Sequence, residues 1–274
     1  MIGVFDSGSG GLTILKALTE RLPDQDFLYY GDHGNAPYGH RSNEQIVDLT
    51  KAGVAQLMNA GCNLVILACN TAAAVALRSL QENWLPSHFP ENRILGVLVP
   101  MVEAITGVPW SQQNSSQKNT SERILLLATQ KTVASNAYPQ EVAKRAPQVE
   151  LIQKACPGLV DAIEGGAGPA PLRGLIGGFV REIDTGGITK VVLGCTHFPL
   201  VEDYFRTILP IDLTILSQPD IVSEALANYL KNHSQYTAKA SGTVSLLTTG
   251  DPETVNKVSH RFVDEKLKFM PANQ

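Results

Sequence analysis

The chain lacks long hydrophobic runs and any excess of positive charge. No apolar stretch approaches the roughly 18 to 20 residues that a membrane-spanning helix needs. The start, Met1 to Asp6, has no basic segment and reaches a charge at position six, so no secretory signal is expected. The 22 basic and 26 acidic residues give a net charge of −4. We therefore expect a cytoplasmic protein that binds neither nucleic acid nor membranes.

Cysteine is scarce, and no pair of cysteines has metal or redox spacing. The chain has four, Cys62, Cys69, Cys156 and Cys195, and contains neither Cys-x-x-Cys nor His-x-x-x-His. Cytoplasmic thiols stay reduced, so these residues do not predict a disulfide framework. Cys195 and His197 could serve as two metal ligands or as an acid/base pair. A zinc site would otherwise need scattered ligands, so none is expected.

What is present is the pattern of an α/β protein. A chain of 274 residues, 43% of them hydrophobic, can bury two cores, and two domains are expected. Short β-branched runs alternate with amphipathic stretches, which predicts doubly wound domains with mostly parallel sheets. The predicted strands are Ile2–Phe5, Phe27–Tyr30, Leu64–Leu67, Ile94–Val97, Ile124–Ala128, Glu150–Gln153, Val191–Leu193 and Val244–Thr248. The predicted helices include Ser42–Ala60, Val160–Ile163, Leu172–Ile183 and Ile221–Asn232. The polar stretch from Pro109 to Glu122 predicts a surface loop without a chemical role.

Two predicted strands end in similar sequences. Leu64-Val-Ile-Leu-Ala-Cys-Asn-Thr71 resembles Lys190-Val-Val-Leu-Gly-Cys-Thr196, since each is an apolar run that ends in small-Cys-polar. Ligands of open α/β sheets bind outside the carboxyl ends of the strands, so each half would bring one cysteine to such an end. We expect a site between two facing halves.

A glycine-rich turn, Phe5-Asp-Ser-Gly-Ser-Gly-Gly-Leu12, follows the first strand. Its N–H groups could hold an anion. The dinucleotide fingerprint fails, because Thr13 stands where its third glycine belongs, and no Gly-Lys-Ser/Thr is present. The alternative is a tight turn in which Asp6 caps the helix that begins near Leu12.

A second polar loop, Gly31-Asp-His-Gly-Asn-Ala-Pro-Tyr-Gly-His-Arg-Ser42, follows the next strand. Its density of glycine and polar side chains is typical of ligand-binding loops. Ordinary cap chemistry is the alternative, with Ser42 as N-cap and Gln45 completing a capping box. The residues themselves favour neither.

The four cysteines differ in their sequence context. Cys62 and Cys156 have no basic partner nearby, and each is expected to pack as a small apolar side chain. Cys69 and Cys195 each follow a strand and precede hydrogen-bonding residues and an expected helix N-terminus, a position that favours a reactive thiolate. His197 stands two residues after Cys195 and could support it as an acid or base.

These segments together resemble the aspartate/glutamate racemase superfamily, and within it the glutamate racemases. The resemblance covers nearly the whole chain. It rests on Phe5-Asp-Ser-Gly-Ser-Gly-Gly-Leu-Thr13, Tyr30-Gly-Asp with Pro37-Tyr-Gly, Ala68-Cys-Asn-Thr-Ala72, Ala128-Thr-Gln-Lys-Thr-Val-Ala-Ser135 with Tyr138, Ala155-Cys-Pro-Gly158 with Glu164, Leu193-Gly-Cys-Thr-His197 with Pro199-Leu200, and Thr249-Gly-Asp-Pro252.

The resemblance implies two pseudosymmetric flavodoxin-like domains with the active site in the cleft between them. Residues 1–97 plus 211–274 would form the domain with Cys69, and residues 98–210 the domain with Cys195. It implies interconversion of L- and D-glutamate without pyridoxal phosphate or another cofactor. The product D-glutamate would supply peptidoglycan in a bacterium. Dimers are frequent in the family, so a homodimer is compatible with the resemblance.

The resemblance also implies residue roles. Cys69 would take the α-proton from the D-enantiomer and Cys195 from the L-enantiomer. Asp6 and Glu164 match residues that assist the first cysteine, and His197 matches the one that assists the second. Positions that hold the substrate are matched by Ser7, Asp32, Pro37, Tyr38, Gly39, Asn70, Thr71 and Thr196.

The chain departs from the common family pattern after Asp32, where it has His33-Gly34-Asn35 in place of Thr-Ala-Arg. It also lacks the acidic residue often found just before Pro100. The alternatives are a racemase of aspartate or another small amino acid, and a non-catalytic binding regulator. A decarboxylase or cis–trans isomerase of the superfamily would use one cysteine, and the two-cysteine pattern argues against it.

Overall fold

The computed structural model describes residues 1–109, 121–237, 241–259, 261–262 and 266–272. The chain divides into two compact units: unit 1 comprises residues 1–97 and 219–274, and unit 2 comprises residues 98–218. The expected boundary at residue 211 differs from this division. Strand β8 (Thr214–Leu216) pairs with β7 (Ile188–Gly194), so backbone hydrogen bonds keep this segment in unit 2. Residues 110–120 of the expected surface loop lie outside the described residues.

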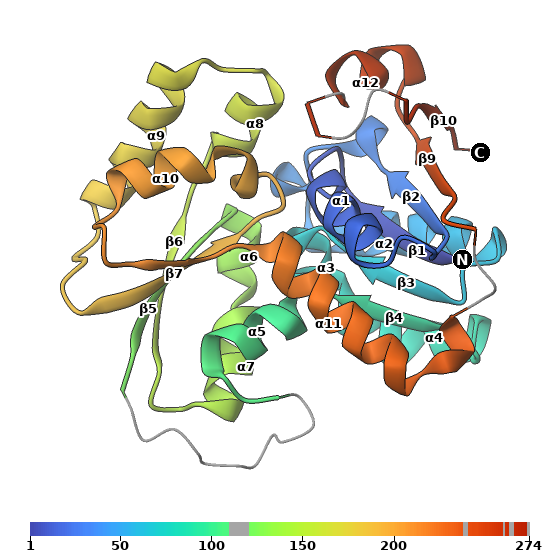
Figure 1. Cartoon of the computed structure of the whole chain (residues 1–274), viewed down its shortest axis with the longest axis horizontal. Coiled ribbons are helices and arrows are strands. Elements are labelled where there is room, and N and C mark those ends of the chain that lie inside the picture. Colours follow the sequence, from blue (N-terminus) through green and yellow to red (C-terminus); the bar gives the residue numbers. More distant parts are fainter. Residues whose placement is uncertain (110–120, 238–240, 260, 263–265, 273–274) are drawn as a thin grey trace. The chain divides into compact units, whose positions relative to one another are not determined.

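Unit 1 holds a six-stranded sheet in the order β10-β9-β2-β1-β3-β4 (Figure 1). Its strands are β1 (Ile2–Asp6), β2 (Phe27–Gly31), β3 (Leu64–Leu67), β4 (Arg93–Gly96), β9 (Val244–Thr248) and β10 (Phe269–Pro271). Every described pair in it is parallel. All residues of β1, β2 and β3 are buried, as expected for central strands of a parallel sheet covered by helices.

Unit 1 has six described α-helices. They are α1 (Leu12–Arg21), α2 (Asn43–Asn59), α3 (Asn70–Ser79), α4 (Leu85–His88), α11 (Gln218–Asn232), which starts at the last residue of unit 2, and α12 (Pro252–Ser259). The capping box of Ser42 and Gln45 is confirmed at the start of α2. Helix α2 packs on β1, where Gly53 lies against the ring of Phe5.

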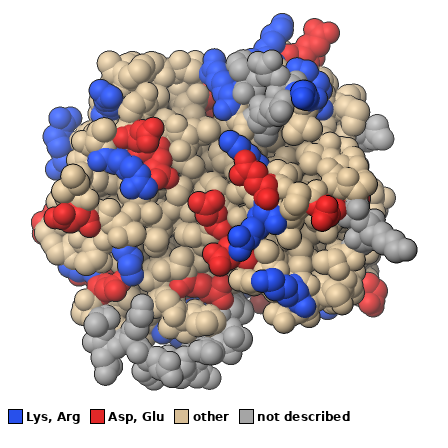
Figure 2. Space-filling model, viewed as in Figure 1, with Lys and Arg blue, Asp and Glu red and all other residues tan. Residues whose placement is uncertain are grey.

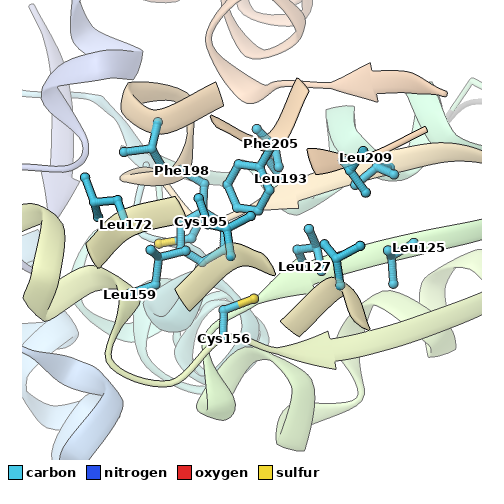
Figure 3. Packing of buried hydrophobic residues seen from close by; sticks show 14 of the residues in the cluster. Leu125, Leu127, Cys156, Leu159, Leu172, Leu193, Cys195, Phe198, Phe205 and Leu209 are labelled. Carbon is cyan, nitrogen blue, oxygen red and sulfur yellow. The ribbon is translucent and has the colours of Figure 1, made fainter. Parts of the chain in front are cut away.

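Unit 2 holds a four-stranded parallel sheet in the order β6-β5-β7-β8. Its other strands are β5 (Arg123–Ala128) and β6 (Glu150–Ala155), and its helices are α5 (Leu98–Thr106), α6 (Gln130–Ser135), α7 (Ala137–Arg145), α8 (Leu159–Glu164), α9 (Pro169–Arg181) and α10 (Glu202–Ile208). Side chains of α8, α9 and α10 pack on one face of this sheet and form a core with those of β5 and β7 (Figure 3).

The two sheets share one strand order. The series β2-β1-β3-β4 in unit 1 corresponds to β6-β5-β7-β8 in unit 2. The order reverses between β1 and β3 in unit 1 and between β5 and β7 in unit 2, and loops at such a switch point are the usual ligand-binding position. The doubly wound α/β prediction is confirmed, and the repeated sequence of Cys69 and Cys195 falls on the equivalent strands β3 and β7.

Charges are mixed on the surface, as the near-balanced composition predicts. On the face drawn in Figure 2, acidic and basic side chains are interspersed and neither sign forms a broad region. Within the described part of the chain, no helix combines the length and apolar character needed to cross a membrane.

Candidate active site

The turn after β1 wraps around the carboxylate of Asp6. This residue is fully buried, and its Oδ1 accepts a 2.9 Å hydrogen bond from the backbone N–H of Gly8. A Cβ at position 11 would lie 2.6 Å from Cβ of Asp6, so glycine is needed there. The interpretation of Asp6 as a helix cap is wrong, because α1 has Gly11 as its N-cap and no side-chain cap. The Asp6 carboxylate instead accepts a hydrogen bond from the turn between β1 and α1.

Cys69 lies two residues after the end of β3 and is the N-cap of α3. Its Sγ accepts a 3.5 Å hydrogen bond from the N–H of Ala72 and lies 3.3 Å from Oγ of Ser7. The expected helix N-terminus after Cys69 is confirmed. The Ser7 contact joins the loops after β1 and β3, which flank the switch point of this sheet. The thiol therefore lies where a ligand of this unit is expected.

Asn70 and Thr71 form the first turn of α3, next to the thiol. Both side chains are almost fully buried. Buried polar groups of this kind are normally hydrogen-bonded, and neither residue is without an interaction partner.

Asp32 follows β2 and is held by three neutral donors. The carboxylate is 2% exposed. Its Oδ2 accepts a 2.7 Å hydrogen bond from the hydroxyl of Tyr38. Its Oδ1 accepts hydrogen bonds from Nδ2 of Asn35 at 3.0 Å and from Oγ1 of Thr249 at 2.6 Å. The carboxylate is thus fixed in direction from three sides.

The hydroxyl of Tyr38 is hydrogen-bonded to Asp32 and is influenced by the charges of further acidic groups of unit 1. Burial raises its pKa far above the ordinary value, and the negative charges of Asp32, Cys69 and Asp6 raise it further. A tyrosine that stays protonated can only donate to Asp32 from this position. Pro37 precedes it in a cis peptide bond with Ala36. Next to it, Gly39 has no atom within 4 Å of where a Cβ would stand, so the space on that side of its Cα is open.

In unit 2, Cys195 lies directly after β7 and faces the imidazole of His197. Its Sγ is 3.9 Å from Nδ1, and Nε2 is 2.6 Å from Oε1 of Glu164. Cys195 also borders the apolar core near Leu159 and Phe198 (Figure 3). The three groups form a chain of thiol, imidazole and carboxylate.

The pKa of His197 reflects its two partners. Burial lowers it, but the hydrogen bonds and negative charges of Cys195 and Glu164 outweigh burial and raise the pKa to about 10. The ring is therefore an imidazolium near neutral pH, able to donate from both nitrogens.

Glu164, which was expected to assist Cys69, is hydrogen-bonded through its carboxylate to His197 in the unit of Cys195, and its expected role toward Cys69 stays a prediction. One other expectation for unit 2 differs from the structure. Cys195 was expected to precede a helix N-terminus. A single 3-10 turn, Phe198–Val201, comes first, because Pro199 opens a short turn before α10. Thr196, which separates Cys195 from His197 in the sequence, is buried.

The two remaining cysteines pack as predicted. Cys62 is fully buried, and burial raises its pKa to about 11. Cys156 lies in the core of unit 2, where burial raises its pKa to about 12 (Figure 3). Both are thiols, not thiolates, near neutral pH.

Among the described residues, no group of three or more His, Cys, Asp and Glu side chains is placed to hold a metal ion. What these residues offer is two strand-end thiols, each with polar partners, and an anchored carboxylate in unit 1.

A model of the Asp/Glu/Hydantoin racemase family matches residues 2–216. The chain belongs to this family. It is 43% identical over 281 residues to a glutamate racemase of Phenylobacterium zucineum, with 99% of each chain covered. Its structure resembles a glutamate racemase of Bacillus anthracis, with a TM-score of 0.87, 27% identity and coverage of 100% of this chain and 97% of the other. It also resembles the glutamate racemase of Francisella tularensis in complex with D-glutamate, with a TM-score of 0.83, 25% identity and coverage of 98% and 95%.

Within this racemase-family chain, the sequence did not indicate that Asn35 and Thr249 bind Asp32. Thr249 opens the motif Thr249-Gly-Asp-Pro252, which carried part of the resemblance but no role. Asn35 lies in the segment that departs from the common family pattern. The signal that could have indicated these two partners is that each is a polar residue within one of these two short segments.

Proposed function

We propose that this protein is a cofactor-independent racemase that interconverts L- and D-glutamate through Cys69 and Cys195. The observation that carries the proposal is the pair of strand-end thiols on equivalent strands of two equivalently ordered sheets. The full-length similarity to glutamate racemases supports the substrate. We further propose that it works in the cytoplasm and supplies D-glutamate for peptidoglycan, as a homodimer.

Inversion of a stereocentre by proton transfer needs an acid/base group on each face of a planar carbanion. In the proposed reaction, the Cys69 thiolate takes the α-proton of D-glutamate, and the electron pair of the C–H bond delocalises into the α-carboxylate. The Cys195 thiol then gives its proton to the opposite face and becomes the thiolate. Reaction of L-glutamate runs in reverse, so no oxidant or cofactor is consumed.

The neighbours of each thiol suit these steps. The hydroxyl of Ser7 lies 3.3 Å from the sulfur of Cys69 and would exchange a proton with it, and the carboxylate of Asp6, held by the turn after β1, is proposed to assist. Near Cys195, the imidazolium of His197, held by Glu164, would stabilise negative charge on the sulfur or return a proton to it. A positioned acid/base group gives about 100- to 10,000-fold acceleration. The rest must come from orientation and electrostatic stabilisation of the carbanion.

Substrate binding is proposed to fall mainly on the loops of unit 1. Asp32 would accept from the ammonium, and Ser7, Pro37, Tyr38, Gly39, Asn70 and Thr71, with Thr196 of unit 2, would hold the carboxylates and the amine. N–H donors beside the carboxylates favour the carbanion, because they stabilise charge that develops there.

The proposal is tested by solvent exchange. Purified protein without added cofactor should introduce deuterium from D₂O at the α-carbon of both L- and D-glutamate, and should do so faster than with aspartate. Absence of exchange with both acids would sink the racemase proposal, and faster exchange of aspartate would sink the choice of substrate.

Alanine variants test the assignment of thiols to faces. Cys69→Ala should lose exchange most with D-glutamate and Cys195→Ala most with L-glutamate, each by about 100-fold or more. Cys62→Ala, a buried thiol outside the site, should keep the wild-type rate. Equal losses for both enantiomers in both variants would contradict the assignment of one face to each thiol.

A further inference from the structure

Two turns that are distant in sequence meet beside Asp32. Strands β2 and β9 are parallel neighbours, with Gly31 opposite Thr248 in the register. The turn of residues 32–35 therefore lies against the turn of residues 248–250. The N–H of Gly34 donates a 3.0 Å hydrogen bond to Oγ1 of Thr249, and this hydroxyl donates at 2.6 Å to Oδ1 of Asp32. One hydroxyl thus links both turns to the carboxylate.

Asn35 supports the same carboxylate oxygen from the other side. Its Nδ2 donates at 3.0 Å to Oδ1 of Asp32. Its own backbone carbonyl accepts a 2.6 Å hydrogen bond from Nε of Arg41, which fixes the turn that carries it. Among the described residues, Oδ1 of Asp32 therefore has two side-chain donors, while Oδ2 has the single donor Tyr38.

Gly34 fits this arrangement because it has no side chain. A Cβ there would lie 2.9 Å from the carbonyl oxygen of Thr249 and 3.2 Å from its hydroxyl. An alanine at this position would push the two turns apart in this backbone. The His33-Gly34-Asn35 segment and the Thr248-Thr249-Gly250 segment are thus fitted to each other.

His33 ties this pair of turns to the glycine-rich turn. Its Nδ1 lies 2.9 Å from Oγ1 of Thr248, and its Nε2 lies 2.9 Å from Oγ of Ser9. The ring also contacts Phe269 of β10 edge-on, with 5.1 Å between centroids. Strand β9 and the edge strand β10 are therefore connected to the loops that carry Ser7 and Asp32.

We propose that Thr249 and Asn35 are positioning residues that aim the Asp32 carboxylate at the α-ammonium of the substrate. A carboxylate has about four acceptor sites. Thr249, Asn35 and Tyr38 donate to three of them. These three hydrogen bonds fix the orientation of the carboxylate and therefore the direction of the remaining acceptor site on Oδ2. This inference rests on the proposed function, in which Asp32 contacts the amine.

The test compares two ligands that differ only in the amine. Titration calorimetry of D-glutamate and of glutarate, which lacks the α-amino group, is carried out on Thr249→Val, Thr249→Ser, Asn35→Ala and the wild type. Thr249→Val should weaken D-glutamate binding by about 10- to 100-fold, the usual effect of losing a hydrogen bond to a charged group, and leave glutarate binding unchanged. Thr249→Ser should retain wild-type affinity for both.

A control substitution removes a hydroxyl elsewhere in unit 1. Thr19 donates to the carbonyl of Lys16 on an exposed face of α1, and Thr19→Val should change neither affinity. A second measurement places Thr249→Val in an Asp32→Ala background. If Thr249 acts through Asp32, the added substitution should have no further effect on D-glutamate binding.

Equal weakening of both ligands by Thr249→Val would overturn the inference and assign Thr249 a purely structural role. Loss in Thr249→Ser as large as in Thr249→Val would do the same. If the wild type binds and racemises glutamate while Thr249→Val and Asn35→Ala behave like it, only this inference fails. Failure of the wild type to bind glutamate would overturn the proposed function as well.

Discussion

At the scale of single residues, the Glu164, His197 and Cys195 series shows how a buried imidazole is kept charged. Burial alone would favour the neutral ring. Two anionic or potentially anionic neighbours reverse that preference, and the pKa rises to about 10. The proton is held between a thiol and a carboxylate, where a catalytic step could use it.

This raised pKa predicts a pH dependence of stability. The folded state binds the His197 proton more tightly than the unfolded chain, whose histidine has a pKa near 6.5. The stabilisation is therefore fully present below about pH 6.5 and is lost as the pH rises through about 10. Glu164→Gln should lower the His197 pKa and cost about 1 to 3 kcal/mol in the free energy of unfolding near pH 6.

Urea denaturation near pH 6 and near pH 10 checks this, together with an NMR titration of the His197 ring. The difference between wild type and Glu164→Gln should shrink at the higher pH. Glu182→Gln, whose carboxylate pairs with Lys154 on the surface, is the control and should show no such trend. A difference that grows with pH would contradict the assigned charge state.

At the scale of elements, glycine-to-alanine substitutions inside helices distinguish the effect of side-chain packing on stability from the effect of helix propensity. In α2, a Cβ at Gly53 would lie 2.3 Å from the ring of Phe5. In α9, a Cβ at Gly174 would meet no atom within 4 Å. The same substitution should therefore have opposite signs in the two helices.

Gly53→Ala should lower the free energy of unfolding of unit 1. Alanine gains about 1 kcal/mol of helix propensity, but overpacking costs about 1 to 3 kcal/mol, and a contact this short belongs at the upper end. Gly174→Ala should gain about 0.5 to 1 kcal/mol in unit 2. Chemical denaturation of each variant measures both, and effects of the same sign would refute the packing argument.

The elements also show what the sequence could predict. All eight predicted strands are present; the bounds of Leu64–Leu67 and Val244–Thr248 are as predicted, and the others differ by one to three residues. Strands β8 and β10 were missed, because each is a three-residue edge strand too short for a periodic signal, and β10 contains Pro271. The five-residue π-turn Leu80–Trp84 between α3 and α4 was missed as well, since it has no local signature.

For the site, local sequence patterns identified individual candidate residues but did not identify the side chains that contact them. Strand ends and polar followers singled out Cys69 and Cys195. The contact of Glu164 with His197 spans 33 residues, and that of Thr249 with Asp32 spans 217. Such pairs depend on which strands become neighbours, which the sequence pattern alone did not determine.

At the scale of the whole molecule, the repeated strand order places one thiol at a strand end in each unit. The strands β9 and β10, which extend the sheet of unit 1, make the two units unequal. Among the strands that the structure describes, β9 and β10 extend the sheet of unit 1 beyond the shared order, and β9 leads into the turn that brings Thr249 to Asp32. The loop after β6, equivalent to the loop of Asp32, instead places Cys156 in the core. Recognition of the amine would thus belong to one unit, while proton transfer would use both.

This division predicts how a ligand protects the chain. A ligand that binds the folded state at about 100 times its dissociation constant adds about 2.7 kcal/mol of stability. If one D-glutamate contacts the loops of both thiols, hydrogen exchange should slow at the start of α3 and also at the Phe198–Val201 turn after β7. Mass spectrometry of these two peptides makes the comparison, with D-lysine as a control that lacks the second carboxylate. Protection confined to the α3 peptide would mean that the substrate engages unit 1 alone, and a two-thiol reaction could not then proceed.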